Sequence, residues 1–193
     1  MGRPSLKKER AFEILEAFMR CVARYGLDGS TQDRIAEEAG VNRTLLRHYV
    51  GNRDEMVAAL LDHIESRFDE MTLALVQDLP PQERSRRLLD RLFAAETHAT
   101  IDAAVYQALV AASDRYPGIR DRLTDFLDRF EATLAQEFAR EHPSAESETC
   151  SMVATGIAAI YFSFDSSLPL KPPPSWRLRH RAAADALLER LRD

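Results

Sequence analysis

The stretch from Ser30 to Met56 reads STQDRIAEEAGVNRTLLRHYVGNRDEM, and it is the part of the sequence that decides the fold. Ser30 is a residue type that caps helices, and Asp33 follows it three positions later. This spacing is typical of a capping box and predicts a short helix over residues 31–39. Gly40 ends that helix, because glycine readily adopts the left-handed conformation that a tight turn requires.

A second short helix follows over residues 43–49, with Asn42 as its N-cap. Ile35 and Leu46 are placed to pack beneath the crossing of the two helices, so the stretch predicts a helix-turn-helix. A helical hairpin with no DNA-binding role would explain the glycine and the small residues. It would not explain so many outward basic groups on a two-turn helix. The outward side chains suit base edges and phosphates, and they are Arg43, Thr44, Arg47 and His48.

Outside this stretch, apolar residues recur at three- and four-residue steps, which is the period of one helix face. Glycine and proline turns separate these segments, and the sequence has no strand alternation and no internal repeat. It therefore predicts an all-α chain of about nine helices. Besides the two short helices, they cover residues 8–25, 54–78, 82–96, 101–115, 119–141 and 147–165, and a last segment near the C-terminus.

The charge of the chain is unevenly spread. The formal net charge of the 193 residues is −5, with a net +2 over residues 1–54 and a net −7 over residues 55–193. A basic N-terminal segment in an otherwise acidic chain favours an anionic partner for that segment. Cys21 and Cys150 are expected to be packing residues in a reducing cytoplasm. The longest uncharged run, residues 149–164, is too short and too polar to span a bilayer, and no signal-type stretch precedes the helices, so we expect a cytoplasmic protein.

The sequence resembles the TetR family of bacterial transcriptional regulators, most strongly over residues 8–60. Beyond residue 60 only the helical layout matches. The resemblance implies a helix-turn-helix DNA-binding domain over residues 1–53, with a short flexible arm at Gly2-Arg3-Pro4, and a helical ligand-binding and dimerisation domain over residues 54–193. The features that carry it are the Ser30-Thr31 start, the run Ile35-Ala36-Glu37-Glu38-Ala39-Gly40-Val41, Leu46, the His48-Tyr49 pair, and Arg53 followed by acidic residues and Met56.

The resemblance also implies roles at DNA. Thr31, at the start of its helix, would hold a phosphate, and Tyr49 and Arg53 would clamp the backbone on the far side. The second short helix would face the major groove, where an arginine can bond guanine O6 and N7 together. The expected DNA-contacting residues are Arg3, Lys7, Thr31, Asn42, Arg43, Thr44, Leu45, Arg47, His48, Tyr49 and Arg53.

Three positions depart from the family pattern, which often has Thr, Tyr and Phe where this chain has Leu45, Arg47 and Val50. Leu45 either touches a thymine methyl group or merely packs. Arg47 adds charge and is expected to change the preferred bases. Val50 is expected to be a packing change only.

In such proteins the rest of the chain holds a ligand cavity and a dimer interface. The candidate cavity residues fit a mostly apolar ligand with one or two polar contacts, although for each one taken singly plain core packing is the favoured alternative. They are Phe68, Met71, Phe93, Thr97, His98, Tyr106, Phe126 and Phe130. The candidate dimer interface lies on the last two helices, and its alternative is packing within a monomer. Its residues are Met152, Gly156, Ile160, Ala183, Leu187 and Leu191.

The function expected from these features is that of a dimeric repressor that binds palindromic operator DNA, has no cofactor, and is released by a small-molecule inducer. A helical adaptor that binds another protein and an activator on the same fold are the alternatives. An enzyme is disfavoured, because the sequence has no glycine-rich phosphate loop and no nucleophile elbow. Its five histidines are scattered without metal-site spacing, although His98 with Glu96 or Asp102 stays open.

Overall fold

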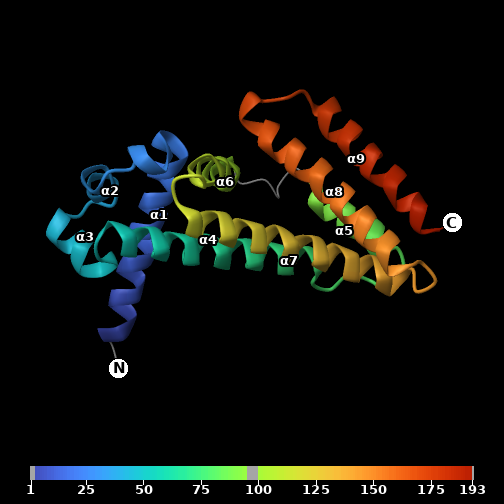
Figure 1. The fold of residues 1–193 in the computed structure, drawn as a ribbon, viewed down its shortest axis with the longest axis horizontal. Helices are drawn as coiled ribbons and strands as arrows, with labels where there is room; N and C mark the ends of the chain where they lie inside the picture. Colours follow the sequence, from blue (N-terminus) through green and yellow to red (C-terminus); the bar gives the residue numbers. More distant parts are fainter. Residues whose placement is uncertain (1–2, 95–99, 193) are drawn as a thin grey trace. The chain divides into compact units, whose positions relative to one another are not determined.

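The computed structural model describes residues 3–94 and 100–192, and within these ranges the chain consists of α-helices, two short 3₁₀-helices and their connections, with no strand (Figure 1). The predicted all-α fold is confirmed, and the described ranges contain nine α-helices. They are α1 (Arg3–Gly29), α2 (Gln32–Glu38), α3 (Arg43–Val50), α4 (Arg53–Val76), α5 (Arg84–Leu92), α6 (Thr100–Ala112), α7 (Pro117–Glu141), α8 (Ser147–Ser167) and α9 (Pro174–Leu188).

The helix ends differ from the predicted ones where single residues adopt a left-handed backbone. Gly26 has φ 69° and kinks α1, so the predicted stop is a kink and helical structure continues to Gly29. Asp78 has φ 54° and follows the end of α4. Glu83 has φ 57° and delays the start of α5 to Arg84, two residues after the predicted start. Side chains with a Cβ rarely adopt this conformation, so neither break could be predicted from the residue types at positions 78 and 83.

The N-cap of α2 is Thr31, and the prediction of a capping box built on Ser30 is wrong. The Thr31 hydroxyl accepts a hydrogen bond from the Arg34 backbone N–H at 3.3 Å. Ser30 is instead buried, and its hydroxyl donates to the Gly26 carbonyl at 2.7 Å. Because the kink at Gly26 brings that carbonyl within reach, the Ser30 side chain closes the preceding turn and the cap moves on by one residue.

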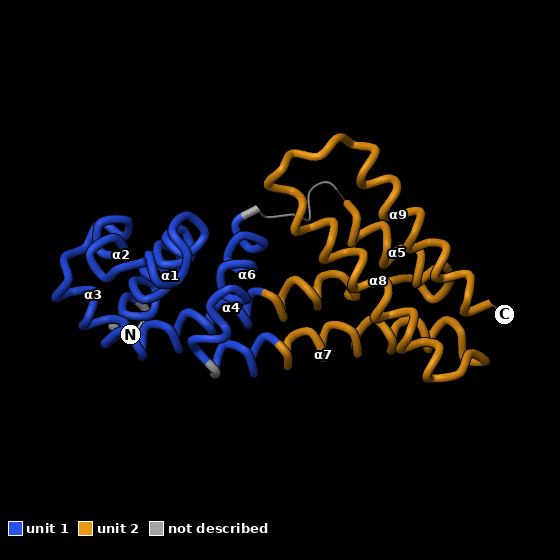
Figure 2. Tube along the Cα trace, turned by 45° about the horizontal axis from the view of Figure 1, so that its top comes forward, with its two compact units in different colours: residues 1–67, 101–123 blue, residues 68–100, 124–193 orange. Residues whose placement is uncertain are grey.

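The described residues form two compact units (Figure 2). Unit 1 comprises residues 1–67 and 101–123, and unit 2 comprises residues 68–100 and 124–193. The helices α4 and α7 each contribute residues to both units. The boundary at residue 53 that the sequence analysis predicts is a division by function, and it stays a prediction.

Each unit has its own buried core. In unit 1, Phe18, Ile35 and Leu46 are fully buried. In unit 2, α9 packs along α8, and the buried residues of α8 recur along one face from Cys150 to Phe164. The stretch of residues 147–170 is long and apolar enough to cross a membrane by length and composition, but a core helix with one buried face meets the same criterion. The predicted burial of Cys21 and Cys150 is confirmed.

Candidate nucleic-acid interface

The helices α2 and α3 are joined by a tight turn that the backbone itself stabilises. Gly40 has φ 64°, the left-handed conformation predicted for this position. The Val41 N–H donates to the Ala36 carbonyl at 2.9 Å, and the Gly40 N–H donates to the Glu37 carbonyl at 3.1 Å. Since Ile35 lies wholly buried under the turn, the crossing of the two helices is fixed by both hydrogen bonds and packing.

The helix α3 separates its side chains sharply into a buried face and an exposed face. Leu46 and Val50 are buried and anchor the helix. Asn42 caps the helix as predicted, because its side-chain oxygen accepts from the Leu45 N–H at 2.8 Å. Leu45 itself is 43% exposed, so it does not pack in the core. The other exposed residues of α3 are Arg43, Thr44, Arg47 and His48.

Thr31 is exposed at the N-terminus of α2, where its hydroxyl can still donate to an acceptor while it accepts from Arg34. Tyr49 is half-buried, and its ring stands edge-on to the ring of His48 at a centroid distance of 5.2 Å. Lys7 is exposed on α1. The expected arm at residues 2–4 begins outside the described residues, and α1 already starts at Arg3.

Arg53 supports the loop before α2 from the first turn of α4. Its guanidinium donates to the carbonyls of Leu27 at 2.7 Å and Ser30 at 2.8 Å. It also lies over the ring of Phe18, 5.2 Å from the centroid. Two nitrogens of the predicted phosphate clamp are therefore used within the chain, and Arg53 fixes the position of the neighbouring Thr31.

The end of α1, directly before that loop, is held by the corner between α6 and α7. The Tyr116 hydroxyl donates to Asp28 at 3.0 Å, and Arg115 forms an ion pair with the same carboxylate. The hydrogen bond to Asp28 raises the pKa of Tyr116, and partial burial adds to the effect. Sequence reasoning missed this joint, because 88 positions separate the two partners and neither residue is unusual in its local context.

In unit 2, four of the predicted ligand residues belong to one aromatic cluster. The ring of Phe126 lies 4.7 Å from that of Phe68 and 6.2 Å from that of Phe130. Tyr161, which was not among the predicted ligand residues, lies 5.9 Å from Phe130 and 6.3 Å from the predicted residue Phe93. The aromatic cluster is thus larger than predicted, and its further members are Tyr161, Phe162 and Phe164.

The other predicted ligand residues are placed less closely. Met71 is half-buried on α4. Tyr106 belongs to unit 1, where burial raises the pKa of its hydroxyl. Thr97 and His98 lie outside the described residues. The prediction of one cavity lined by all eight residues is therefore not tested.

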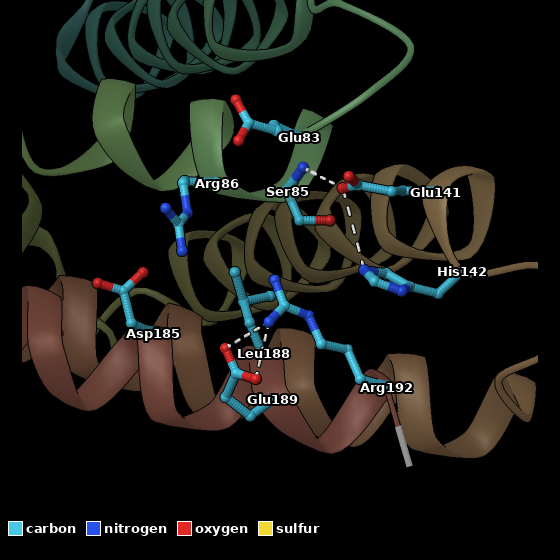
Figure 3. Close-up of a pocket in the computed structure, with 9 residues that line it drawn as sticks. All are labelled: Glu83, Ser85, Arg86, Glu141, His142, Asp185, Leu188, Glu189 and Arg192. Carbon is cyan, nitrogen blue, oxygen red and sulfur yellow. Dashed lines mark hydrogen bonds and ion pairs between the residues drawn. The ribbon is translucent and has the colours of Figure 1, made fainter.

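Two cavities in unit 2 have contrasting walls. One, of about 260 Å³, has Phe126 and Phe130 as its apolar wall, beside the ion pair of Asp69 and Arg129. The other, of about 140 Å³, is polar and contains none of the predicted ligand residues (Figure 3). Its lining residues are Glu83, Ser85, Arg86, Glu141, His142, Asp185, Leu188, Glu189 and Arg192.

The polar cavity lies beside the N-terminus of α5, which lacks a side-chain cap of its own. Glu141, in the last turn of α7, replaces that cap and accepts from the Ser85 N–H at 2.6 Å. Burial acts to raise the pKa of Glu141, but the hydrogen bond from the Ser85 N–H and the nearby His142 act against it, and the pKa lies below its usual range. The Glu141 carboxylate thus already occupies the anion-binding end of α5.

The predicted dimer residues divide into two groups. Gly156 is covered by Leu187, whose Cδ1 atom would lie 2.8 Å from a Cβ added at Gly156, and Leu191 is buried. These three residues pack α9 and the turn after it against α8 within the chain, which is the alternative that the sequence analysis left open. Met152 and Ala183 are exposed, and Ile160 is half-buried.

Comparison with known proteins bears on this arrangement. Residues 14–60 match the family model of bacterial regulatory proteins of the tetR family. The chain is 23% identical over 175 residues to the HTH-type transcriptional regulator BetI of Rhizobium meliloti (strain 1021), an alignment that covers 90% of this chain and 85% of that one. It is 28% identical over 105 residues to the HTH-type transcriptional regulator PksA of Bacillus subtilis (strain 168), covering 54% and 51% of the two chains.

Two solved structures share the fold. A TetR transcription regulator from Haloarcula marismortui ATCC 43049 superposes with a TM-score of 0.77 at 17% identity, over 94% of this chain and 97% of that one. A transcriptional regulator from Saccharomonospora viridis, solved in complex with choline, superposes with a TM-score of 0.74 at 20% identity, over 94% and 96%. The family model over the helix-turn-helix and the relatives along most of the chain's length together support a DNA-binding transcriptional regulator of the TetR family.

Proposed function

We propose that the protein is a repressor that binds palindromic operator DNA as a dimer and is released by a small ligand. The observation that carries the proposal is the exposed face of α3, which offers Arg43, Thr44 and Arg47 on a helix anchored from below by Leu46. Two guanidinium groups and a hydroxyl can pair with base edges in a major groove.

In this proposal the contacts to bases and to phosphates come from different elements. Arg43, Thr44 and Arg47 read bases, and Leu45 touches a thymine methyl group, since it is exposed. Thr31 holds a phosphate from the start of α2 through its hydroxyl. The remaining proposed phosphate contacts are Arg3, Lys7, His48, Tyr49 and Arg53, while Asn42 acts through the cap of α3.

Dimerisation is proposed through the exposed faces of α8 and α9. Met152 is 56% exposed on α8, and Leu178 is 68% exposed on α9. Two such helices from each subunit would bury these residues in a four-helix interface. Each subunit would present one DNA-binding head, the helix-turn-helix of α2 and α3. The two heads would then contact half-sites that lie about one helical turn, or a multiple of it, apart on the same DNA.

The ligand is proposed to bind in unit 2, against the aromatic cluster. Rings favour apolar molecules, and their faces also attract quaternary ammonium groups. A structural relative is solved with choline, so choline is the first small molecule to test beside apolar compounds. We expect no cofactor and no catalysis, and a cytoplasmic location where the DNA is accessible.

The proposed route of switching is α4. This one helix carries Arg53, which holds the loop before α2, and Phe68, which belongs to the aromatic cluster. A ligand that fits only when α4 moves would disfavour the head positions that DNA requires. A coupling of about 1–3 kcal/mol would lower operator affinity by roughly 5- to 150-fold, and operator DNA must weaken ligand binding by the same factor.

The test begins with selection of binding sites from random DNA, followed by binding curves measured by fluorescence anisotropy. We expect a palindromic consensus, bound by two copies of the chain in light-scattering measurements. A protein that selects no sequence is the helical adaptor, and this result would refute the proposal. Reporter expression from the selected site separates a repressor from an activator. Titration of choline into the complex, with sodium chloride as the ionic control, tests release by this ligand.

A further inference from the structure

The first residue of α3 is held by the first turn of α2. The Nε atom of Arg43 lies 3.3 Å from the Asp33 carboxylate, and its Nη2 atom donates to the Gln32 side-chain oxygen at 3.5 Å. Both partners precede the turn at Gly40, whereas Arg43 follows it. The spacing from Ser30 predicted that Asp33 belongs to a capping box, but in the structure Thr31 caps α2 by accepting from the Arg34 backbone N–H. The Asp33 carboxylate is therefore available for Arg43.

The position of Asp33 is unfavourable for simple electrostatic attraction to DNA. Its side chain is 71% exposed, next to the face of α3 that the proposed function turns toward DNA. A carboxylate there repels phosphates, and an exposed ion pair contributes little to the stability of the folded head. Asp33 also lies in the first turn of α2, where a negative charge favours the helix. The contact with Arg43 is a second consequence of its position, and it is the one that bears on DNA.

The effect of this contact is to restrict the Arg43 guanidinium. A free arginine side chain has many rotamers and loses their entropy when it pairs with a base. With Nε toward Asp33 and Nη2 toward Gln32, the Nη1 atom and one N–H of Nη2 stay available, which is enough for a two-point contact to guanine O6 and N7. When DNA covers the site and excludes water, the Asp33–Arg43 pair also becomes stronger.

We propose that Asp33 is a positioning residue that sets the base preference of Arg43. It orients the guanidinium for one base position, and it raises the cost of complexes in which Arg43 turns to a phosphate instead. The inference rests on the proposed reading of DNA by α3. It adds a determinant of specificity on α2, a helix to which the family resemblance assigned only the phosphate contact of Thr31.

The test measures base preference, which charge or stability alone would not change. After a consensus has been selected with the wild-type protein, affinities are measured for each of the four bases at every half-site position. The variants are Asp33→Asn, Arg43→Ala and the double variant. Glu37→Gln is the matched control, because Glu37 is exposed on the same helix and has no contact with Arg43 among the described residues. Melting curves check that each variant folds.

Arg43→Ala is expected to reduce the preference at one position by about 5- to 150-fold. Asp33→Asn is expected to reduce it at the same position by about twofold or more, with no further effect in the double variant. Asp33→Asn and Glu37→Gln should both raise affinity for all DNA, since each removes a negative charge. If Asp33→Asn raises affinity but leaves the base preference unchanged, as Glu37→Gln should, the inference is overturned while the proposed function stands. If the wild-type protein selects no sequence, both fall.

Discussion

Each of the two compact units is stabilised internally, and the kinds of contact inside them differ. In unit 1, Arg67 on α4 donates to both oxygens of the buried Asp102 on α6 at 3.1 Å, and to Glu16 on α1 at 3.3 Å. Unit 2 also contains ion pairs, such as that of Arg84 with Glu137, and it contains the aromatic cluster. Both units have an apolar core, but unit 1 adds a buried ion network to it and unit 2 adds packed rings.

This difference suits two different tasks. A hydrogen-bonded ion network has few good geometries, so the bonds of Arg67 restrict how α1, α4 and α6 can shift against one another. Ring packing allows several offsets and tilts of similar energy, so the aromatic cluster can adjust around a ligand. The proposed function requires both properties, a rigid DNA-binding part and a part that can adjust to a ligand.

The largest expected difference between the units is in their response to salt. If six to ten phosphates are contacted by the two heads of a dimer, DNA affinity should fall roughly a thousandfold or more between 50 and 200 mM salt. Ligand binding to the aromatic cluster should change little, because it displaces few ions. Anisotropy titrations with DNA and calorimetry with ligand measure the two slopes. A flat slope for DNA would exclude phosphate binding by the exposed basic residues of the head.

The second prediction concerns the ring packing of unit 2. Phe126→Ala should lower the free energy of unfolding by about 3–5 kcal/mol, because it leaves a cavity among neighbouring rings. Phe12→Ala is the control, since Phe12 is 53% exposed on α1 in unit 1. That change should stay within about 0.5 kcal/mol in urea denaturation. Equal costs for the two variants would mean that the aromatic cluster is not a packed core.

The third prediction distinguishes, within unit 1, a residue that holds the loop before α2 from a residue that contacts DNA bases. Arg53→Ala should lower stability by about 1–3 kcal/mol, because two carbonyls lose a charged donor, and should weaken binding to all DNA alike. Arg47→Ala should leave stability within about 0.5 kcal/mol. It should cost about 1–3 kcal/mol in DNA binding at one base position.

Denaturation and anisotropy on consensus and scrambled DNA distinguish these outcomes. Equal losses on both DNAs for Arg47→Ala would make Arg47 a phosphate contact. An unchanged stability for Arg53→Ala would mean that its hydrogen bonds to Leu27 and Ser30 do not hold the loop.

The head was well predicted because its signals are local. Gly40, Asn42 and the alternation of buried Leu46 with exposed neighbours act within a few residues, and the structure places them as the spacing indicates. The Ser30 cap failed for a reason that is also local, since the kink at Gly26 offered its hydroxyl a nearer acceptor. Helix periodicity, however, does not reveal such a competing hydrogen bond.

The contacts between distant segments could not be predicted. Asp28 and Tyr116, or Arg67 and Asp102, are ordinary residues in their local context, and only the tertiary fold pairs them. In unit 2 the aromatic residues were visible in the sequence, but their periodicity is that of any core. Residues such as Leu187 were assigned to a dimer interface, because an apolar face looks the same whether α9 packs on α8 or on a second chain.

The smallest expected effect concerns the joint at Asp28, where unit 1 holds the loop before α2. Tyr116→Phe removes the hydroxyl that donates to Asp28 and should lower stability by about 0.5–1.5 kcal/mol.

The raised pKa of Tyr116 gives a sharper signature, since hydrogen bonding favours the protonated phenol in the folded state. The stability gained from this bond is fully present below the ordinary tyrosine pKa of about 10, and it is lost as the pH rises through the higher folded-state value. The stability difference between wild type and Tyr116→Phe should therefore be constant from pH 7 to about 9.5 and shrink above it. Chemical denaturation at several pH values measures this difference, with Tyr25→Phe as the control for a tyrosine outside the joint. A difference that persists unchanged to pH 11 would mean that the ring of Tyr116 packs here but its hydroxyl does not hold Asp28.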